Sequence, residues 1–485
     1  MTPASPTGVL LACWLTAGCG VQQAGPSTEL DARRDSETQD TDSGAANASG
    51  TEDTGPEVVP EEGTGMREID CGIDGPIEAG TDWTGDGWQD LAVSYVDDRG
   101  YGVMVVEGPL RTLSQCSASA SAIATSAEGS FLSGISYAAG DANDDGVPDL
   151  IVASGRYSSS DGYYTGAAFL CTGPLTVGGE LEHATQVLYD DDTHIVKAGI
   201  ILAEPTSERA TIIGTSSDFG LFSFGSEAEG TLLLDDASAH WTAESLGGIT
   251  EMVSEGDLDG DGVEDLVVTN HAYPPEDGGD DSGQVVVLSS ASPEGLIEDF
   301  ALASFTGPKT VSWAGRDAAV GDWTGDGYDD LAISLLNLDE YLNNGAVLVF
   351  AGPLDGDLGL DSAELTWEGS DDWWYFGDGI ELTDDLTGDG NADLVGSQPN
   401  TDDGYGRVYV LAGPRTGVVT TDEADWTFQG NENYVGNGHR HYSPNFGSEL
   451  TWTPVASEDG EPAAVIGTKE TNQLFITYGL GAWKE

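Results

Sequence analysis

The sequence predicts an all-β chain that folds as a seven-bladed β-propeller behind an acidic amino-terminal segment. Three observations lead to this prediction. A nine-residue aspartate loop recurs five times, the copies lie at multiples of about 60 residues, and each interval has room for about four short strands. Evenly spaced short strands with Gly and Asp turns are typical of all-β folds. One small sheet cannot bury both faces alone, so such units pack side by side around a ring.

The composition limits the classes of partner. The 485 residues include 86 Asp and Glu but only 15 Lys and Arg, and the formal net charge is −71. Charge repulsion therefore excludes nucleic acid or an anionic membrane surface as the main partner. Gly is abundant, at 68 residues, without the Gly-X-Y period of collagen.

The amino terminus predicts export. Residues 1–18 contain a short apolar run that is typical of a signal peptide and too short to span a bilayer. The segment Leu15–Cys19 resembles a bacterial lipobox, so Cys19 is expected to carry a lipid anchor; a plain secretion signal is the alternative. Residues 19–65 are rich in Asp, Glu, Ser, Thr and Gly and are expected to form a disordered acidic linker. The propeller is expected over residues 66–485.

The repeated loop has the form Asp-x-[Asp/Asn/Thr]-x-Asp-Gly-x-x-Asp and is followed at once by an apolar strand that begins with Leu. The five copies span residues 82–90, 141–149, 257–265, 322–330 and 385–393. The interval between the second and third copies is about twice the others, so a degenerate third unit is expected at residues 198–208. A degenerate seventh unit fits residues 446–467, which brings the total to seven.

Each unit predicts the same order of strands. A Gly-led strand precedes the loop, as at residues 314–321, a second follows it, a third begins after a turn, as at residues 345–354, and a weaker fourth completes the blade. After the last degenerate loop, only two strands remain in the chain. We therefore expect Met66–Asp70 to supply the outer strand of the seventh blade, which closes the ring and removes open edges.

The loop chemistry predicts cation binding. Cations of calcium size take six to eight oxygen ligands at roughly 2.3–2.6 Å. Positions one, three, five and nine carry oxygen-bearing side chains, position seven offers a backbone carbonyl, and Gly at position six permits a turn with positive φ. The expected ligands are Asp82, Thr84, Asp86, Trp88, Asp90, Asp141, Asn143, Asp145, Val147, Asp149, Asp257, Asp259, Asp261, Val263, Asp265, Asp322, Thr324, Asp326, Tyr328, Asp330, Asp385, Thr387, Asp389, Asn391 and Asp393.

The loops have two other interpretations. An EF-hand needs a Glu at position twelve and flanking helices, but here position twelve is Val, Ile or Gly and a strand begins at position ten. A metal-free turn held by Asp side chains is the second. It is disfavoured because three or four carboxylates would then repel each other at short range.

The Gly-led strand, the aspartate loop and the following Leu-x-[Val/Ile] strand resemble FG-GAP (VCBS) repeats, which build the propeller of integrin alpha subunits and of many bacterial surface proteins. The resemblance covers roughly residues 66–485. It implies about five Ca²⁺ sites within the blades and ligand binding by loops on one face. The third and seventh units depart from the pattern, so they are expected to bind no calcium.

The expected function is a calcium-stabilised binding or adhesion module for protein or polysaccharide, secreted or anchored at the bacterial outer membrane or cell surface, acting as a monomer and without catalysis. The alternative is a calcium-dependent polysaccharide lyase or hydrolase. The sequence contains no His-Glu-x-x-His or Gly-x-Ser-x-Gly motif, and the pair His439 and His441 is interpreted as part of an exposed loop.

Cysteine and tryptophan positions give further expectations. With Cys13 removed and Cys19 lipidated, Cys71 and Cys116 are expected to form a disulfide, and Cys171 occupies a core-like position as a buried thiol. Trp83 and Trp323, inside aspartate loops, are expected to pack between blades. The pair Trp373–Trp374 has sugar stacking as an alternative role.

Overall fold

The computed structural model divides the chain into two units, Met1–Glu57 and Val58–Glu485. It describes residues 66–477 apart from internal gaps, of which the longer are 111–119, 126–130, 176–185, 275–280, 290–294, 339–343, 431–446 and 454–462. The expectations for residues 1–65, for the Cys71–Cys116 pair, for Trp373–Trp374 and for His439 and His441 lie outside the described residues. Within them, no helix has the length and apolar character needed to cross a bilayer.

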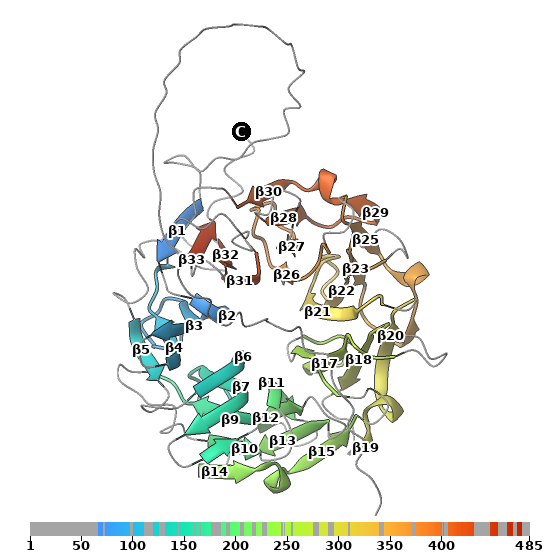
Figure 1. Cartoon of the computed structure of the whole chain (residues 1–485). Coiled ribbons are helices and arrows are strands. Elements are labelled where there is room, and N and C mark those ends of the chain that lie inside the picture. Colours follow the sequence, from blue (N-terminus) through green and yellow to red (C-terminus); the bar gives the residue numbers. More distant parts are fainter. Residues whose placement is uncertain are drawn as a thin grey trace, which may run out of the picture. The chain divides into compact units, whose positions relative to one another are not determined.

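Seven antiparallel sheets follow one another around unit 2, and each is one blade (Figure 1). The chain enters every blade at its innermost strand and moves outward. Blade 1 contains β2 (Ile73–Thr81), β3 (Asp90–Asp97), β4 (Gly100–Val106) and β5 (Ala120–Thr125). Blade 2 contains β6 (Phe131–Gly140), β7 (Asp149–Ser159), β8 (Gly162–Tyr164), β9 (Gly166–Cys171) and β10 (Gln186–Asp190). Blade 3 contains β11 (Ile195–Ala203), β12 (Glu208–Thr215), β13 (Leu221–Gly225) and β15 (Ala239–Thr242).

The remaining blades repeat this order. Blade 4 contains β16 (Glu251–Val253), β17 (Asp265–Asn270), β18 (Gln284–Ser289) and β20 (Ala301–Thr306), and blade 5 contains β21 (Ala314–Gly321), β22 (Asp330–Leu335), β23 (Ala346–Phe350) and β25 (Leu365–Glu368). Blade 6 contains β26 (Ile380–Thr383), β27 (Asp393–Gln398), β28 (Arg407–Ala412) and β30 (Trp426–Gln429). Blade 7 contains β31 (Glu449–Thr453), β32 (Ala463–Thr468) and β33 (Gln473–Thr477) with β1 (Met66–Asp70). The seven-bladed all-β prediction is confirmed, including a third blade without a complete aspartate loop.

The amino-terminal strand completes the last blade, as the sequence predicts. β1 pairs antiparallel with β33, from Met66 opposite Thr477 to Asp70 opposite Gln473. Blade 7 is therefore built from both ends of the described chain. This pairing covers the edge of β33, which would otherwise present a row of unpaired backbone groups.

In the described residues, four blades carry an additional outer strand that the sequence did not predict. It comes from the next blade, in the connection between that blade's third and fourth strands, and it pairs in parallel with the outer edge. These strands are β14 (Gly230–Leu233), β19 (Gly295–Leu296), β24 (Gly356–Leu358) and β29 (Gly417–Thr420), on blades 2, 3, 4 and 5 respectively. Each begins with a Gly of positive φ and is followed by a single 3-10 turn. Successive blades are thus joined by backbone hydrogen bonds as well as by side-chain packing.

The core lies between the sheets. Each of seven buried hydrophobic clusters is shared by two adjacent blades. One of them contains Ile77 and Leu91 of blade 1 together with Val465 and Ile476 of blade 7, so side-chain packing also closes the ring. Cys171 is a free, partly buried thiol beside the cluster between blades 1 and 2, and burial raises its pKa to about 12.

Two loop tryptophans hold neighbouring blades together, as predicted. Trp83 is fully buried among residues of blade 2, and its indole N–H donates to the carbonyl of Asp149 at 3.1 Å. Trp323 is fully buried against blade 6 and donates to the carbonyl of Arg415 at 3.1 Å. Both rings are therefore core residues rather than a surface for stacking on a ligand.

Replacement of Trp323 by alanine should lower the free energy of unfolding by about 3–5 kcal/mol, the usual cost of emptying a buried aromatic site. Urea unfolding of the calcium-loaded protein measures this loss. Trp323→Phe keeps most of the buried area and removes the N–H donor, so its loss should be clearly smaller. A Trp323→Ala loss below 1 kcal/mol would contradict this packing role.

Candidate metal centres and the central cavity

The five aspartate loops occupy equivalent places in blades 1, 2, 4, 5 and 6. Each loop joins the innermost strand of its blade to the second strand, which begins with the aspartate at position nine. Because the strands run in the same order in every blade, the five loops lie at the same end of their sheets.

The aspartate at position one shapes the turn. Asp82 accepts hydrogen bonds from the backbone N–H groups of Gly85, Asp86 and Gly87 at 2.7, 3.1 and 2.9 Å. In the other four loops, the equivalent aspartate accepts from the N–H groups of positions five and six. Gly at position six has a φ between 83° and 93° in all five copies. The predicted need for Gly at this position is confirmed.

The aspartate at position five also bonds to its own loop. In every copy, one carboxylate oxygen accepts the N–H of position seven, at distances from 2.8 to 3.1 Å. Each carboxylate oxygen has two lone pairs. These bonds therefore fix the direction of the side chains without using all of their capacity to bind a cation.

The aspartate at position nine is buried and connects the loop to the third strand. Asp90, fully buried, accepts from the N–H of Thr84 at 2.9 Å and from that of Gly108 at 3.1 Å. Asp149 and Asp330 accept in the same way from Gly173 and Gly352, at 2.9 and 2.8 Å.

The sequence prediction missed these glycines, although each begins a Gly-Pro pair at the end of a third strand. A Cβ on Gly108, Gly173 or Gly352 would lie within 2.5 Å of a backbone oxygen, so no other residue fits. The recurrence of Gly-Pro was the available signal.

Two loops bring three carboxylates together. Ligand oxygens of Asp82, Asp86 and Asp90, and those of Asp257, Asp259 and Asp265, lie within 4.8 Å of one another. In the described part of the chain, the other three loops do not bring three acidic side chains that close. Their carboxylates hold the same backbone partners, and position three is Asn143, Thr324 or Thr387, as it is Thr84 in the loop of blade 1.

The residues at position three fit a cation in two of the loops. The hydroxyl oxygens of Thr84 and Thr324 are buried and have no hydrogen-bond partner in the structure. A buried oxygen without a partner is unfavourable unless something else binds it. These hydroxyls and the acidic side chains of the same loops offer only oxygen donors, which is compatible with Ca²⁺.

The raised pKa values of three loop aspartates also favour cation binding. Burial, together with the charges of Asp259 and Asp261, raises the pKa of Asp265 to about 7. Burial also raises the pKa of Asp90, beside Asp86, and of Asp393, beside Asp389, to about 6. The cation-free loops thus hold carboxylates in surroundings that disfavour their charge, and a bound divalent cation would reverse this effect.

The pKa values predict how calcium binding depends on pH. The folded, calcium-free protein binds protons at Asp265 more tightly than the unfolded chain does, so this group stabilises the calcium-free form at low pH. That contribution is lost as the pH rises through about 7. Calcium must displace the proton, so affinity at the loop 257–265 should fall about tenfold per pH unit well below pH 7. Titrations at pH 5, 6 and 8 measure it; an affinity independent of pH would contradict a role for Asp265.

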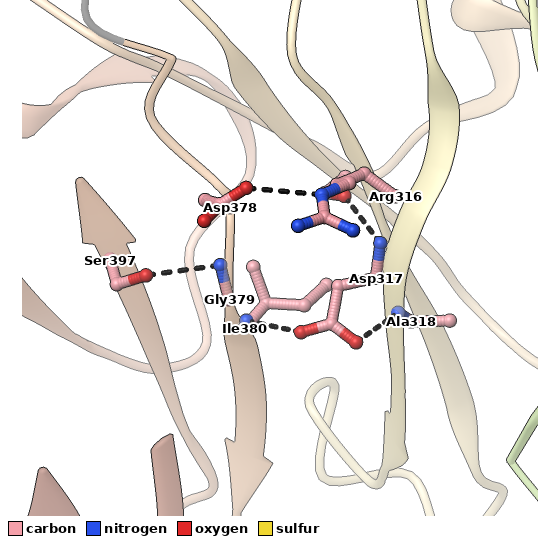
Figure 2. Close-up of polar contacts among 8 residues, drawn as sticks. Arg316, Asp317, Ala318, Asp378, Gly379, Ile380 and Ser397 are labelled. Carbon is pink, nitrogen blue, oxygen red and sulfur yellow. Dashed lines mark hydrogen bonds and ion pairs between the residues drawn. The ribbon is translucent and has the colours of Figure 1, made fainter. Parts of the chain in front are cut away.

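A cavity of about 800 Å³ is lined by the innermost strands of six blades. Among the described residues that border it, eight carry a carboxylate and one, Arg316, carries a guanidinium. Arg316 Nε donates to Asp378 Oδ1 of the next blade at 3.1 Å, and Asp317 accepts the N–H of Ile380 at 2.8 Å (Figure 2). Blades 5 and 6 are therefore joined at the cavity wall by paired polar groups, which the sequence did not predict.

Comparison with known proteins agrees with this architecture. The family model described as FG-GAP repeat matches residues 253–288, which include the aspartate loop of blade 4 and the strands around it. Integrin alpha pat-2 of Caenorhabditis elegans is 26% identical over 238 residues, which make up 46% of this chain and 18% of that protein. The match thus spans less than a fifth of the length of this relative.

Two solved structures cover 84% of this chain. One is BBS1N in complex with ARL6DN soaked with lead, with a TM-score of 0.48 and 10% identity, and the match covers 94% of that chain. The other is the same complex soaked with mercury, with a TM-score of 0.43 and 11% identity, and the match covers 93% of that chain. The seven sheets and the repeat match, rather than these two likenesses, define the fold. The described residues form a seven-bladed β-propeller that matches the FG-GAP repeat over residues 253–288 and is similar to integrin alpha.

Proposed function

We propose that this protein is a calcium-stabilised binding or adhesion module that acts outside the cell and has no catalytic role. The similarity to integrin alpha supports a binding module of the adhesion type. The observation that carries the proposal is the repeated loop, in which five sets of oxygen ligands stand at one end of the sheets. Bound calcium would stiffen this end and leave the loops at the opposite end to contact a protein or polysaccharide.

The position of the propeller relative to the cell forms part of the proposal. A leader ending at residue 18, a lipid at Cys19 and the acidic linker 19–65 would place the propeller at a bacterial surface. A net charge of −71 suits a protein that stays dispersed in an extracellular medium rich in cations. Mass spectrometry of the amino-terminal peptide from membranes tests the anchor, because a lipidated Cys19 has a distinct mass.

Binding of the full-length protein to arrays of extracellular proteins and of polysaccharides, in calcium and in EGTA, tests the function. The expected result is saturable, calcium-dependent binding without release of reducing ends from any polysaccharide. Asp257→Asn, which removes a carboxylate from one loop, should weaken binding through loss of stability, whereas Leu233→Ser, at a side chain 55% exposed on β14, should not. Turnover of a polysaccharide, or no binding on either array, would contradict the proposal.

A further inference from the structure

Strained backbone is concentrated at one place in the described residues. The four non-glycine residues with positive φ there are Asp281, Val311, Trp313 and Tyr375, with φ between 48° and 57°. The N–H of Trp313 donates to the carbonyl of Asp281 at 3.1 Å, and the rings of Trp313 and Tyr375 lie 5.9 Å apart. Side chains larger than Gly disfavour this conformation, and such strain gathers at ligand sites.

The two aromatic residues occupy equivalent positions in adjacent blades. Ala314, which follows Trp313, forms a parallel bridge with Gly283, and Phe376, which follows Tyr375, forms the same kind of bridge with Gly345. Their rings meet at an interplanar angle of 55°, and both side chains are partly exposed. This end of the inner strands is opposite the aspartate loops, because β21 runs from Ala314 toward the loop at 322–330.

Polar groups surround the aromatic pair. Three residues further along the chain, Arg316 and Asp378 form the ion pair at the cavity wall (Figure 2). Two asparagines flank the aromatics: the N–H of Asn337 donates to the carbonyl of Ser312, and the carbonyl of Asn344 accepts from the N–H of Phe376. Both are at least nine-tenths buried, and neither side-chain oxygen has a hydrogen-bond partner in the structure. The two asparagines are thus bonded through the backbone to residues next to the aromatic pair, and their buried side-chain oxygens are unpaired.

This combination selects for a neutral, hydroxyl-rich ligand. An aromatic face is electron-rich and packs against the C–H groups of a sugar ring, whose hydroxyls donate to amide oxygens and accept from a guanidinium. The acidic cavity and the net charge of −71 disfavour anionic ligands such as uronates. Asp378 is already paired with Arg316, which makes the cluster a poor match for a cationic side chain.

We propose that the aromatic cluster, defined as Trp313 and Tyr375 with the Arg316–Asp378 pair, binds one ring of a neutral saccharide. The inference rests on the proposed binding function and names its ligand class. Backbone strain at Trp313 and Tyr375 then has a role, since it keeps both rings partly exposed at the end of the inner strands opposite the aspartate loops.

The test uses full-length, calcium-loaded protein and soluble neutral oligosaccharides of glucose, galactose, mannose, xylose and N-acetylglucosamine, with calorimetry and tryptophan fluorescence as readouts. At least one should bind, and Trp313→Gly and Tyr375→Gly should each weaken it at least tenfold. Because Gly tolerates positive φ, both variants should melt at or above the temperature of the wild type. Trp313→Tyr should retain most of the affinity, and the control Leu233→Ser all of it.

Other outcomes would overturn the inference. These are no binding of any neutral oligosaccharide, binding that survives both glycine substitutions, or a melting temperature lowered by both, which would make the rings structural. Binding of a lysine-rich peptide that is lost in the same variants would assign the cluster to a protein partner instead. If calcium-dependent binding on the protein array persists while every saccharide fails, the saccharide inference falls and the binding function stands.

Discussion

Removal of calcium with EGTA is expected to lower the melting temperature of the full-length protein by at least about 10 °C. A ligand at 100 times its Kd stabilises a protein by about 2.7 kcal/mol per independent site, and the chain has about five such loops. The loops connect the first two strands of five blades, so their loss of order would spread to the sheets. Calorimetry in calcium and in EGTA, with bound metal counted by mass spectrometry, measures both quantities.

Single loops should contribute separately to this effect. Asp82→Asn and Asp257→Asn each remove a carboxylate from a loop in which three acidic side chains converge, and each should remove one bound ion. Glu264→Gln, within the loop of blade 4 but at position eight, which is not an expected ligand, should leave the ion count unchanged. A count of two ions in the wild type would restrict metal binding to the loops of blades 1 and 4. No thermal shift at all would favour turns held together by their own hydrogen bonds.

Loss of the closing strand is the second large effect. A chain that begins at Gly72 lacks β1 and leaves five residues of β33 without their antiparallel partner. At about 1 kcal/mol for each hydrogen bond lost, the free energy of unfolding should fall on the order of 5 kcal/mol. The exposed edge of β33 should also promote association between chains. Thermal melts and size-exclusion chromatography of the truncated protein measure the two consequences.

A chain that begins at Glu57 is the matched control, because it keeps β1 and all of unit 2. It should melt like the full-length protein. Ile69→Pro, which removes one N–H from β1, should destabilise less than the deletion does. If the chain starting at Gly72 stayed monomeric with an unchanged melting temperature, β1 would have no part in closing the ring.

The repeated loops and strands of this protein could be predicted from residues that lie close together in the sequence. The ligand pattern of the loops, the need for Gly87 and its equivalents, and the strands on either side follow from residues a few positions apart. Such patterns can be recognised because the turn and the strand alternation are set by neighbouring residues. The assignment of Met66–Asp70 to blade 7 followed from counting strands, since a propeller with an incomplete blade leaves an open edge.

Contacts between blades were not encoded in any local pattern. The additional outer strands and the Arg316–Asp378 pair join segments that lie 44 to 62 residues apart. The aromatic pair of Trp313 and Tyr375 is of the same kind, because each ring is unremarkable in its own segment. The sequence by itself determined the number of blades and the glycine turn of each loop, and it predicted the ligands that the loops would offer to a cation. Only the tertiary structure decided which side chains meet across a blade junction, because that depends on how the twisted sheets pack around the ring.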